Sequence, residues 1–210
     1  MAVLTLTVDY QSFTTTLSKS ENSSPIYVGG TNKFGIYRSC YRFDLTSLPA
    51  GAIVSQVRLK LNITTVGGAA GVWDVHAYNT TGQTDPSADA AATQYTRDAS
   101  GNLYLDDDVT WRAVSNTWII LGGTVNTDVQ NAKVAGTVYA LGVHEEGDND
   151  GPPWADGATT KPQLEITYTT GGGVTIKKGS NLAATVTEML NSKMLFSFCN
   201  RFPKLTTRRF

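Results

Sequence analysis

Apolar and polar residues alternate along much of the first 170 positions, with the two-residue period that is typical of half-buried β-strands. The clearest run covers residues 57–63, where every second residue is Val, Leu or Ile and the residues between them are Arg, Lys or Asn. The same alternation occurs in residues 4–10, 41–45 and 163–168. Residues 137–143 are apolar on both faces instead, which predicts a central strand covered from both sides.

Short segments that contain Gly or Pro separate these runs, and no stretch before residue 170 keeps a helical period over three turns. The turn signals lie at residues 48–51, 66–68, 100–102, 122–123 and 150–153. Many short strands divided by turns predict an all-β fold, an antiparallel β-sandwich of the jelly-roll type. A C-terminal extension with a short helix or an extended arm follows this sandwich.

Composition excludes several classes of protein. The 210 residues are 40% hydrophobic and 17% charged, unlike a disordered chain, a coiled coil or a collagen. No apolar run approaches the roughly 20 residues that span a bilayer, so we expect no membrane insertion. The first residues lack a basic stretch followed by a long apolar run, so we expect no signal peptide. Two cysteines, Cys40 and Cys199, are too few for a disulfide framework.

Charge divides the chain at a glycine run. Residues 171–210 carry seven basic residues against Glu188 alone, a net charge of +6, whereas residues 1–170 have a net charge of −7. We therefore predict a sandwich domain over residues 1–168, a flexible linker over 169–173 and a basic, aromatic docking arm over 174–210. A solvated basic tail is the alternative.

The arm is rich in large apolar residues, which argue against a solvated tail. Those expected to carry its docking contacts, together with its arginines, are Met189, Leu190, Phe196, Phe198, Arg201, Phe202, Arg208, Arg209 and Phe210. The net positive charge would attract phosphate, but the aromatic residues are mixed with Leu and Met. This mixture favours a buried protein contact and disfavours nucleic acid as the partner.

The most acidic stretch covers residues 144–157. Its carboxylates predict a structural Ca²⁺ site, the one cofactor that the residues suggest, with the ligands Glu145, Glu146, Asp148 and Asp150. The same loop combines a flat aromatic ring with polar side chains, as sugar sites do. The predicted glycan-binding residues are Trp154, Asp148, Asn149 and Asp150. A solvated surface loop is the alternative.

Other groups that could carry chemistry are more readily explained as structural. Residues 106–108 are three consecutive aspartates, typical of a charge cluster where a strand begins. His76 and His144, the two histidines of the chain, are expected to be structural. No nucleophile elbow, His-Glu-x-x-His, phosphate-binding loop or dinucleotide fingerprint is present. We therefore expect a protein that is not an enzyme.

Residues 36–61 contain an arginine-bearing strand, the sequence FDLTSLPAGA at residues 43–52 and an alternating strand after it. This segment resembles the opening half of DNRLRE-type jelly-roll domains, which are grouped with carbohydrate-binding modules. Thr-Trp at 110–111 and PQLEITY at 162–168 extend the resemblance over residues 1–168. It implies a non-catalytic β-sandwich of the kind found on secreted polysaccharide-active enzymes, on surface proteins and in phage particles.

The FDLTSLPAGA segment also predicts its own local structure. Pro49 presets the backbone for a turn, and Gly51 permits a positive φ. Phe43 and Leu45 should enter the core, while the charged Arg42 and Asp44 point outward or pair with neighbours. A structural role is therefore expected for this segment.

Together these observations predict a non-catalytic structural and recognition module, most specifically a phage virion component. It would be a capsid decoration or tail protein, a homo-oligomer or part of a larger assembly. Its partners would be other virion proteins, bound through residues 174–210, and a surface polysaccharide bound by the exposed sandwich. The alternative is an extracellular, free-standing carbohydrate-binding module that acts with polysaccharide-degrading enzymes. A polysaccharide lyase or hydrolase is a third, weaker hypothesis.

Overall fold

The computed structural model describes residues 1–23, 26–31, 35–65, 72–108, 116–136, 138–145, 154–156 and 161–170. The chain divides into two units, Met1–Gly171 and Gly172–Phe210. All described residues belong to the first unit, so the predicted docking arm lies outside them. No helix in the described ranges has both the length and the apolar character that crossing a membrane requires.

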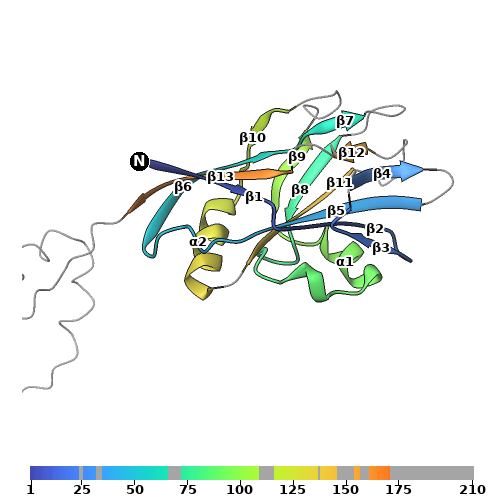
Figure 1. Cartoon of the computed structure of the whole chain (residues 1–210), viewed down its shortest axis with the longest axis horizontal. Helices are drawn as coiled ribbons and strands as arrows, with labels where there is room; N and C mark the ends of the chain where they lie inside the picture. The colour runs from blue at the N-terminus through green and yellow to red at the C-terminus, as the bar shows by residue number, and fades with distance from the viewer. Residues whose placement is uncertain are drawn as a thin grey trace, which may run out of the picture. The chain divides into compact units, whose positions relative to one another are not determined.

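Eight strands form an antiparallel sandwich with jelly-roll connectivity (Figure 1). They are β1 (Ala2–Thr7), β5 (Gly35–Phe43), β6 (Ala52–Lys60), β8 (Trp73–Ala77), β9 (Leu103–Asp108), β10 (Trp118–Ile120), β11 (Tyr139–Glu145) and β13 (Gln163–Thr170). The smaller sheet has the order β1-β13-β6-β10, and the larger sheet contains the order β5-β11-β8-β9. Among these eight, the first and last strands pair, and so do the second and seventh, as in a jelly roll. The predicted all-β sandwich is confirmed.

Five further strands widen the larger sheet. They are β2 (Tyr10–Thr14), β3 (Lys19–Glu21), β4 (Ile26–Thr31), β7 (Ile63–Thr65) and β12 (Trp154–Asp156). β4 continues the sheet beyond β5 and pairs with β12, which pairs with β7. β2 pairs with both β5 and β3. We call the face of the larger sheet that points away from the smaller sheet its outer face.

The predicted alternation matches the observed burial. Val57, Leu59, Leu61 and Ile63 are all buried in the core, while the residues between them are partly exposed. Residues 139–143 of β11 are buried without exception, as expected for a strand covered on both faces. One face of β11 lies in the sandwich core, and the backbone of Asp98 packs against Gly142 on the outer face.

The predicted strand at residues 4–10 is two strands in different sheets. Leu4, Leu6, Val8 and Tyr10 are less exposed than the residues between them, so the alternation itself is correct. The Val8 N–H donates to the Pro162 carbonyl, beside the smaller sheet, and the Asp9 N–H donates to the Arg42 carbonyl in the larger one. The chain therefore crosses between sheets here without losing its two-residue period.

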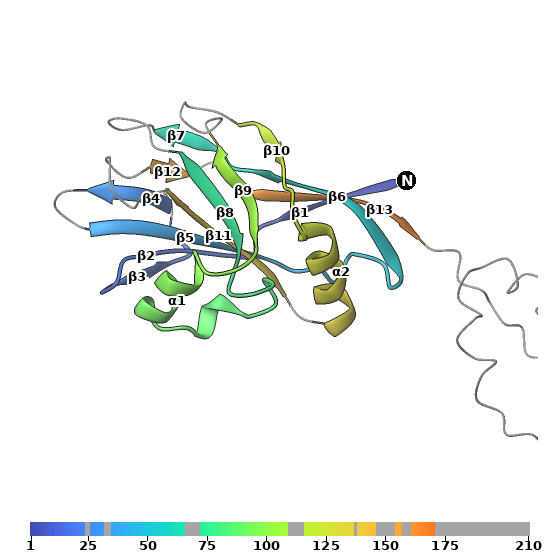
Figure 2. The ribbon, with the colours of Figure 1, turned by 180° about the vertical axis from the view of Figure 1, so that it is seen from behind.

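The expectation of no three-turn helix before residue 170 is wrong. α2 (Val125–Ala135) has 11 residues and lies beside β6, as Figure 2 shows. Its buried residues are Val125, Asp128, Val129 and Ala132, which have helical spacing. Because one of the four is a carboxylate, the apolar pattern alone did not indicate a helix.

Two shorter helical segments lie near the outer face, η1 (Pro86–Ala88) and α1 (Ala91–Arg97). The Gln94 amide of α1 donates to the Ser12 hydroxyl at 2.6 Å. The Thr14 hydroxyl donates to Asp98, which follows α1, at 3.3 Å. These bonds hold α1 over β2.

Candidate functional site

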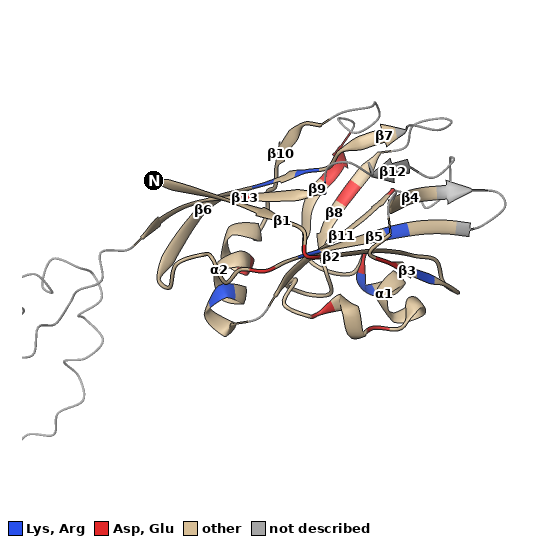
Figure 3. Cartoon of the chain, viewed as in Figure 1, with Lys and Arg blue, Asp and Glu red and all other residues tan. Residues whose placement is uncertain are grey.

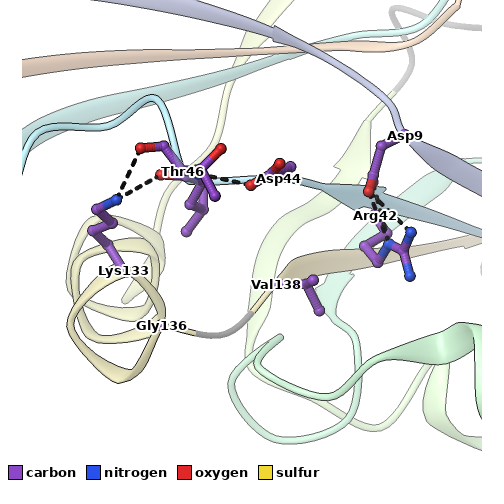
Figure 4. A pocket seen from close by; sticks show the side chains of 8 residues that line it. Asp9, Arg42, Asp44, Thr46, Lys133, Gly136 and Val138 are labelled. Carbon is purple, nitrogen blue, oxygen red and sulfur yellow. Dashed lines mark hydrogen bonds and ion pairs between the residues drawn. The ribbon is translucent and has the colours of Figure 1, made fainter.

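A pocket of about 310 Å³ lies beside the segment that resembles DNRLRE-type domains (Figure 4). It is lined by Asp9, Arg42, Asp44, Leu45, Thr46, Lys133, Gly136 and Val138. The pocket has charged groups of both signs, which makes it a candidate binding site for a polar ligand.

The charged groups of this pocket are already engaged within the protein. Arg42 forms a double hydrogen bond to the Asp9 carboxylate, with the shortest N–O distance 2.9 Å, and contacts Asp85 at 2.8 Å. Lys133 Nζ donates to the carbonyl oxygens of Leu45 and Thr46, each at 3.1 Å. These groups hold the strand, the turn and α2 together, which is a structural role.

The turn itself has the predicted conformation. Phe43 and Leu45 are buried, and the Ala52 N–H donates to the Pro49 carbonyl at 3.2 Å. Gly51 has a φ of 73°, in the left-handed region that favours glycine. The predicted turn and the predicted burial of Phe43 and Leu45 are confirmed.

Asp44 stabilises the beginning of this turn. Its carboxylate accepts a hydrogen bond from the Thr46 N–H at 2.7 Å, and this bond lowers the pKa of the Asp44 carboxyl below its usual value. The side chain is exposed and points away from the core, as predicted. The Asp44 carboxylate therefore caps the turn.

Most of the residues predicted to bind glycan or Ca²⁺ lie outside the described ranges. This applies to Glu146, Asp148, Asn149 and Asp150, to the side chain of Trp154 and to all the predicted docking residues of the arm. The backbone of Trp154 begins β12 and pairs with Val28. Glu145 ends β11 and is buried. Both predicted sites stay predictions.

The described residues contain a different constellation of chemically active groups, on the outer face. Asp74 and His76 are two positions apart on β8, and His144 lies directly opposite Asp74 on β11. Ligand atoms of these three residues all lie within 4.8 Å of one another. Three side chains that can each donate an electron pair therefore converge on one point.

Both imidazole rings are held by backbone carbonyls. His76 Nδ1 lies 3.1 Å from the Gly101 oxygen, and His144 Nδ1 lies 3.0 Å from the Glu145 oxygen. A carbonyl can only accept, so each Nδ1 carries a proton, and in the neutral form of each ring Nε2 holds the free electron pair. Burial lowers the pKa of His144, so this ring is neutral at neutral pH.

Acidic residues of β9 adjoin this constellation. Figure 3 shows acidic positions on the neighbouring strands β8 and β9. Ligand atoms of Asp106 and Asp107 lie within 4.8 Å of Asp74 and of each other, and both residues are exposed. The Asp107 N–H donates to Asp74 Oδ1 at 3.0 Å, which orients the Asp74 carboxylate. The irregular register between β8 and β9 brings both aspartates beside Asp74.

The sequence interpretation missed this constellation. Asp74 and His76 form an Asp-x-His pattern on a strand, which places both on one face and was a usable signal. The position of His144 beside them depends on the register of two strands that are almost 70 residues apart. Nothing local in the sequence indicates that register.

A second cluster on the larger sheet is aromatic. Phe13 of β2 packs edge-on against Tyr27 of β4 and Tyr37 of β5, with ring centroids 5.1 and 5.4 Å apart. All three rings are partly exposed. Half-buried aromatic rings offer flat apolar surface to a ligand.

No protein-family model matches the chain, and no curated protein matches it significantly. The resemblance to DNRLRE-type domains therefore remains an expectation from residues 36–61, 110–111 and 162–168.

Proposed function

We propose that the chain is a non-catalytic structural and recognition module of a phage virion, either a capsid decoration or a tail protein. In this proposal the segment 174–210 anchors the chain to the particle, and the sandwich is exposed to the surroundings. The resemblance to a family of non-catalytic sandwiches that occurs in phage particles supports this proposal.

The observation that carries the proposal is that the sandwich completes itself before the basic segment begins. β13 lies between β1 and β6 in the smaller sheet and is the last strand in the part of the chain that the structure describes. Its inward residues Leu164 and Ile166 are fully buried in the core. The remaining 39 residues, Gly172–Phe210, form a separate unit with a strongly positive charge. A complete fold followed by a chemically different segment is the organisation of an anchored module.

Truncation tests this proposal. A chain that ends at Gly171 should unfold cooperatively, with a Tm within a few degrees of the full chain. Sedimentation velocity should show that the full chain assembles and the truncated chain does not. Replacement of Phe196, Phe198 and Phe202 by Ser in the full chain should weaken assembly like the truncation. Unfolding of the truncated chain would show that the segment belongs to the fold, contrary to the proposal.

Purified particles give a second, direct test. Mass spectrometry of phage particles from the source that encodes this chain should detect it at a constant ratio to the major capsid protein. The assembly proposal would be contradicted if the particles lack this protein and the full chain also stays monomeric in solution.

The aromatic cluster favours a second candidate function, a carbohydrate-binding module that acts with polysaccharide-degrading enzymes. A glycan array should show binding by the full chain, and Tyr37→Ala should weaken it by about tenfold, equivalent to ~1.4 kcal/mol. Trp154→Ala tests the site predicted from the acidic loop. Tyr95→Ala is the matched control, because its ring stacks on Arg38 outside the cluster. Absence of binding by the folded chain would exclude this function for the glycans tested.

A further inference from the structure

We propose that Asp74, His76 and His144 bind a divalent transition-metal ion of the Zn²⁺ type on the outer face of the larger sheet. The proposal stands independently of the function proposed above, because it requires neither the segment 174–210 nor a glycan. It assigns a ligand role to the two histidines of the chain.

The backbone places the three side chains together without help from loops. Successive residues of a strand point to opposite faces, so Asp74 and His76 share the outer face of β8. His144 pairs with Asp74 across the sheet, and residues directly opposite in an antiparallel pair share a face. β8 and β11 both have paired strands on each side, so the site rests on the rigid middle of the sheet.

The hydrogen bonds of the imidazole rings are those expected of metal ligands. A histidine that binds a metal through one nitrogen commonly donates its other N–H to a backbone carbonyl, which fixes the tautomer and the ring orientation. Here the carbonyls of Gly101 and Glu145 accept from His76 and His144. The Asp107 N–H holds Asp74 Oδ1 in the same way, which leaves Oδ2 available.

One atom in the site lacks the partner that its burial requires. His144 Nε2 is shielded from solvent and has no hydrogen-bond partner among the described residues. It lies 3.8 Å from Asp74 Oδ2, too far for a hydrogen bond, and both atoms present electron pairs. A buried ring nitrogen that faces a carboxylate oxygen with its electron pair is unfavourable unless a cation lies between the two atoms. A tetrahedral ion with bonds of about 2.1 Å would place its ligand atoms about 3.4 Å apart.

The local charge is suited to a cation. Asp74, Asp106 and Asp107 contribute three carboxylates, against the guanidinium of Arg38. Arg38 donates a hydrogen bond to the Tyr95 carbonyl at 2.9 Å and stacks on the ring of that residue at 4.1 Å. The exposed carboxylates of Asp106 and Asp107 are near enough to supply a fourth ligand after a side-chain rotation.

The ligand types indicate the class of metal. Two imidazole nitrogens and one carboxylate oxygen suit Zn²⁺ and its transition-metal neighbours, whereas Ca²⁺ and Mg²⁺ prefer oxygen ligands alone. The site is therefore distinct in chemistry from the Ca²⁺ site predicted on the acidic loop. Excess Ca²⁺ should not displace the bound ion.

Calorimetric titration of the full chain with ZnCl₂, after treatment with a chelator, tests the proposal. We expect one high-affinity site, and we expect His76→Gln and His144→Gln each to weaken binding by at least about tenfold. Asp44→Asn is the matched control, because it changes an exposed carboxylate in the turn and keeps its capping oxygen. Cys199→Ser tests a thiolate site in the C-terminal segment. The proposal is overturned if Zn²⁺ does not bind, or if binding survives both histidine substitutions.

A measurement on the unmutated chain tests the proposal even if the variants fail to fold. The chain has two histidines, so a long-range ¹H–¹⁵N NMR spectrum contains two ring patterns. Both rings should carry their proton on Nδ1 before metal is added, and Zn²⁺ should shift both Nε2 resonances. Rings that are protonated on Nε2, or resonances that Zn²⁺ leaves unchanged, would overturn the assignment.

Discussion

Asp128 attaches α2 to the larger sheet, because one oxygen of its buried carboxylate accepts hydrogen bonds from residues in and beside β9. Its Oδ2 accepts hydrogen bonds from the Thr124 hydroxyl at 2.6 Å, the Tyr104 hydroxyl at 2.7 Å and the Asn102 amide at 2.9 Å. Burial raises the pKa of Tyr104, so its hydroxyl remains a donor at neutral pH. Asp128→Ala removes the acceptor from all three donors at once.

The cost of this substitution follows from the exposure of each donor. Thr124 is exposed and Asn102 is partly exposed, so water replaces the lost acceptor and each bond costs about 0.5–1 kcal/mol. Tyr104 is only 4% exposed, and the loss of its carboxylate acceptor in this buried setting costs about 1–3 kcal/mol. We expect a total loss near 3 kcal/mol. Asp128→Asn keeps an acceptor of the same size and should cost about half as much.

Urea unfolding of the full chain at pH 7, followed by tryptophan fluorescence, measures these losses. A double-mutant cycle with Tyr104→Phe should give a coupling energy of at least about 1 kcal/mol, because the two side chains share one buried hydrogen bond. The reasoning is refuted if Asp128→Ala costs less than about 1 kcal/mol, or if the two substitutions are additive.

Three further predictions concern the outer face and the turn. Gly142→Ala should lower the free energy of unfolding in urea by about 1–3 kcal/mol. The added Cβ would lie 2.0 Å from the Asp98 carbonyl oxygen and would push α1 away. An unchanged free energy of unfolding would contradict this prediction. Burial raises the pKa of the Asp98 carboxyl in the folded state. The protonated carboxyl therefore contributes its full share to the free energy of unfolding below pH ~4. This contribution falls as the pH rises toward the folded-state pKa, by at most about 1.4 kcal/mol per pH unit. Asp98→Asn should therefore flatten stability measured from pH 4 to 8, and an unchanged slope would show that Asp98 is not its source. Gly51→Ala should lower the free energy of unfolding by about 1 kcal/mol. The cause is the φ of 73° alone, since nothing lies within 4 Å of the added Cβ. Gly51→Asn should lower it by less in the same assay.

The fold class was predictable because burial in a strand follows a local rule. The inward positions of residues 57–63 can be identified from side-chain type alone, since a strand turns every second side chain to the same face. The turn at residues 48–51 was predictable for a similar reason, because Pro and Gly restrict or permit backbone angles wherever they occur.

α2 was not predictable because its stabilisation is not local. Asp128 lies on the buried stripe, where an apolar residue would ordinarily mark a helix. It is tolerated there because donors from Asn102 and Tyr104, more than 20 residues earlier, satisfy its carboxylate. The buried stripe of α2 can be explained only when these hydrogen-bond partners of Asp128 are known.

The candidate metal site divides in the same way. The sequence alone determined that Asp74 and His76 share one face of a strand, because that depends only on a spacing of two residues. Tertiary structure alone decided that His144 lies opposite Asp74, because strand register is set by the packing of the whole sandwich core. The spacing of residues on a strand is a property of the backbone, whereas the neighbour across the sheet depends on every element that buries it.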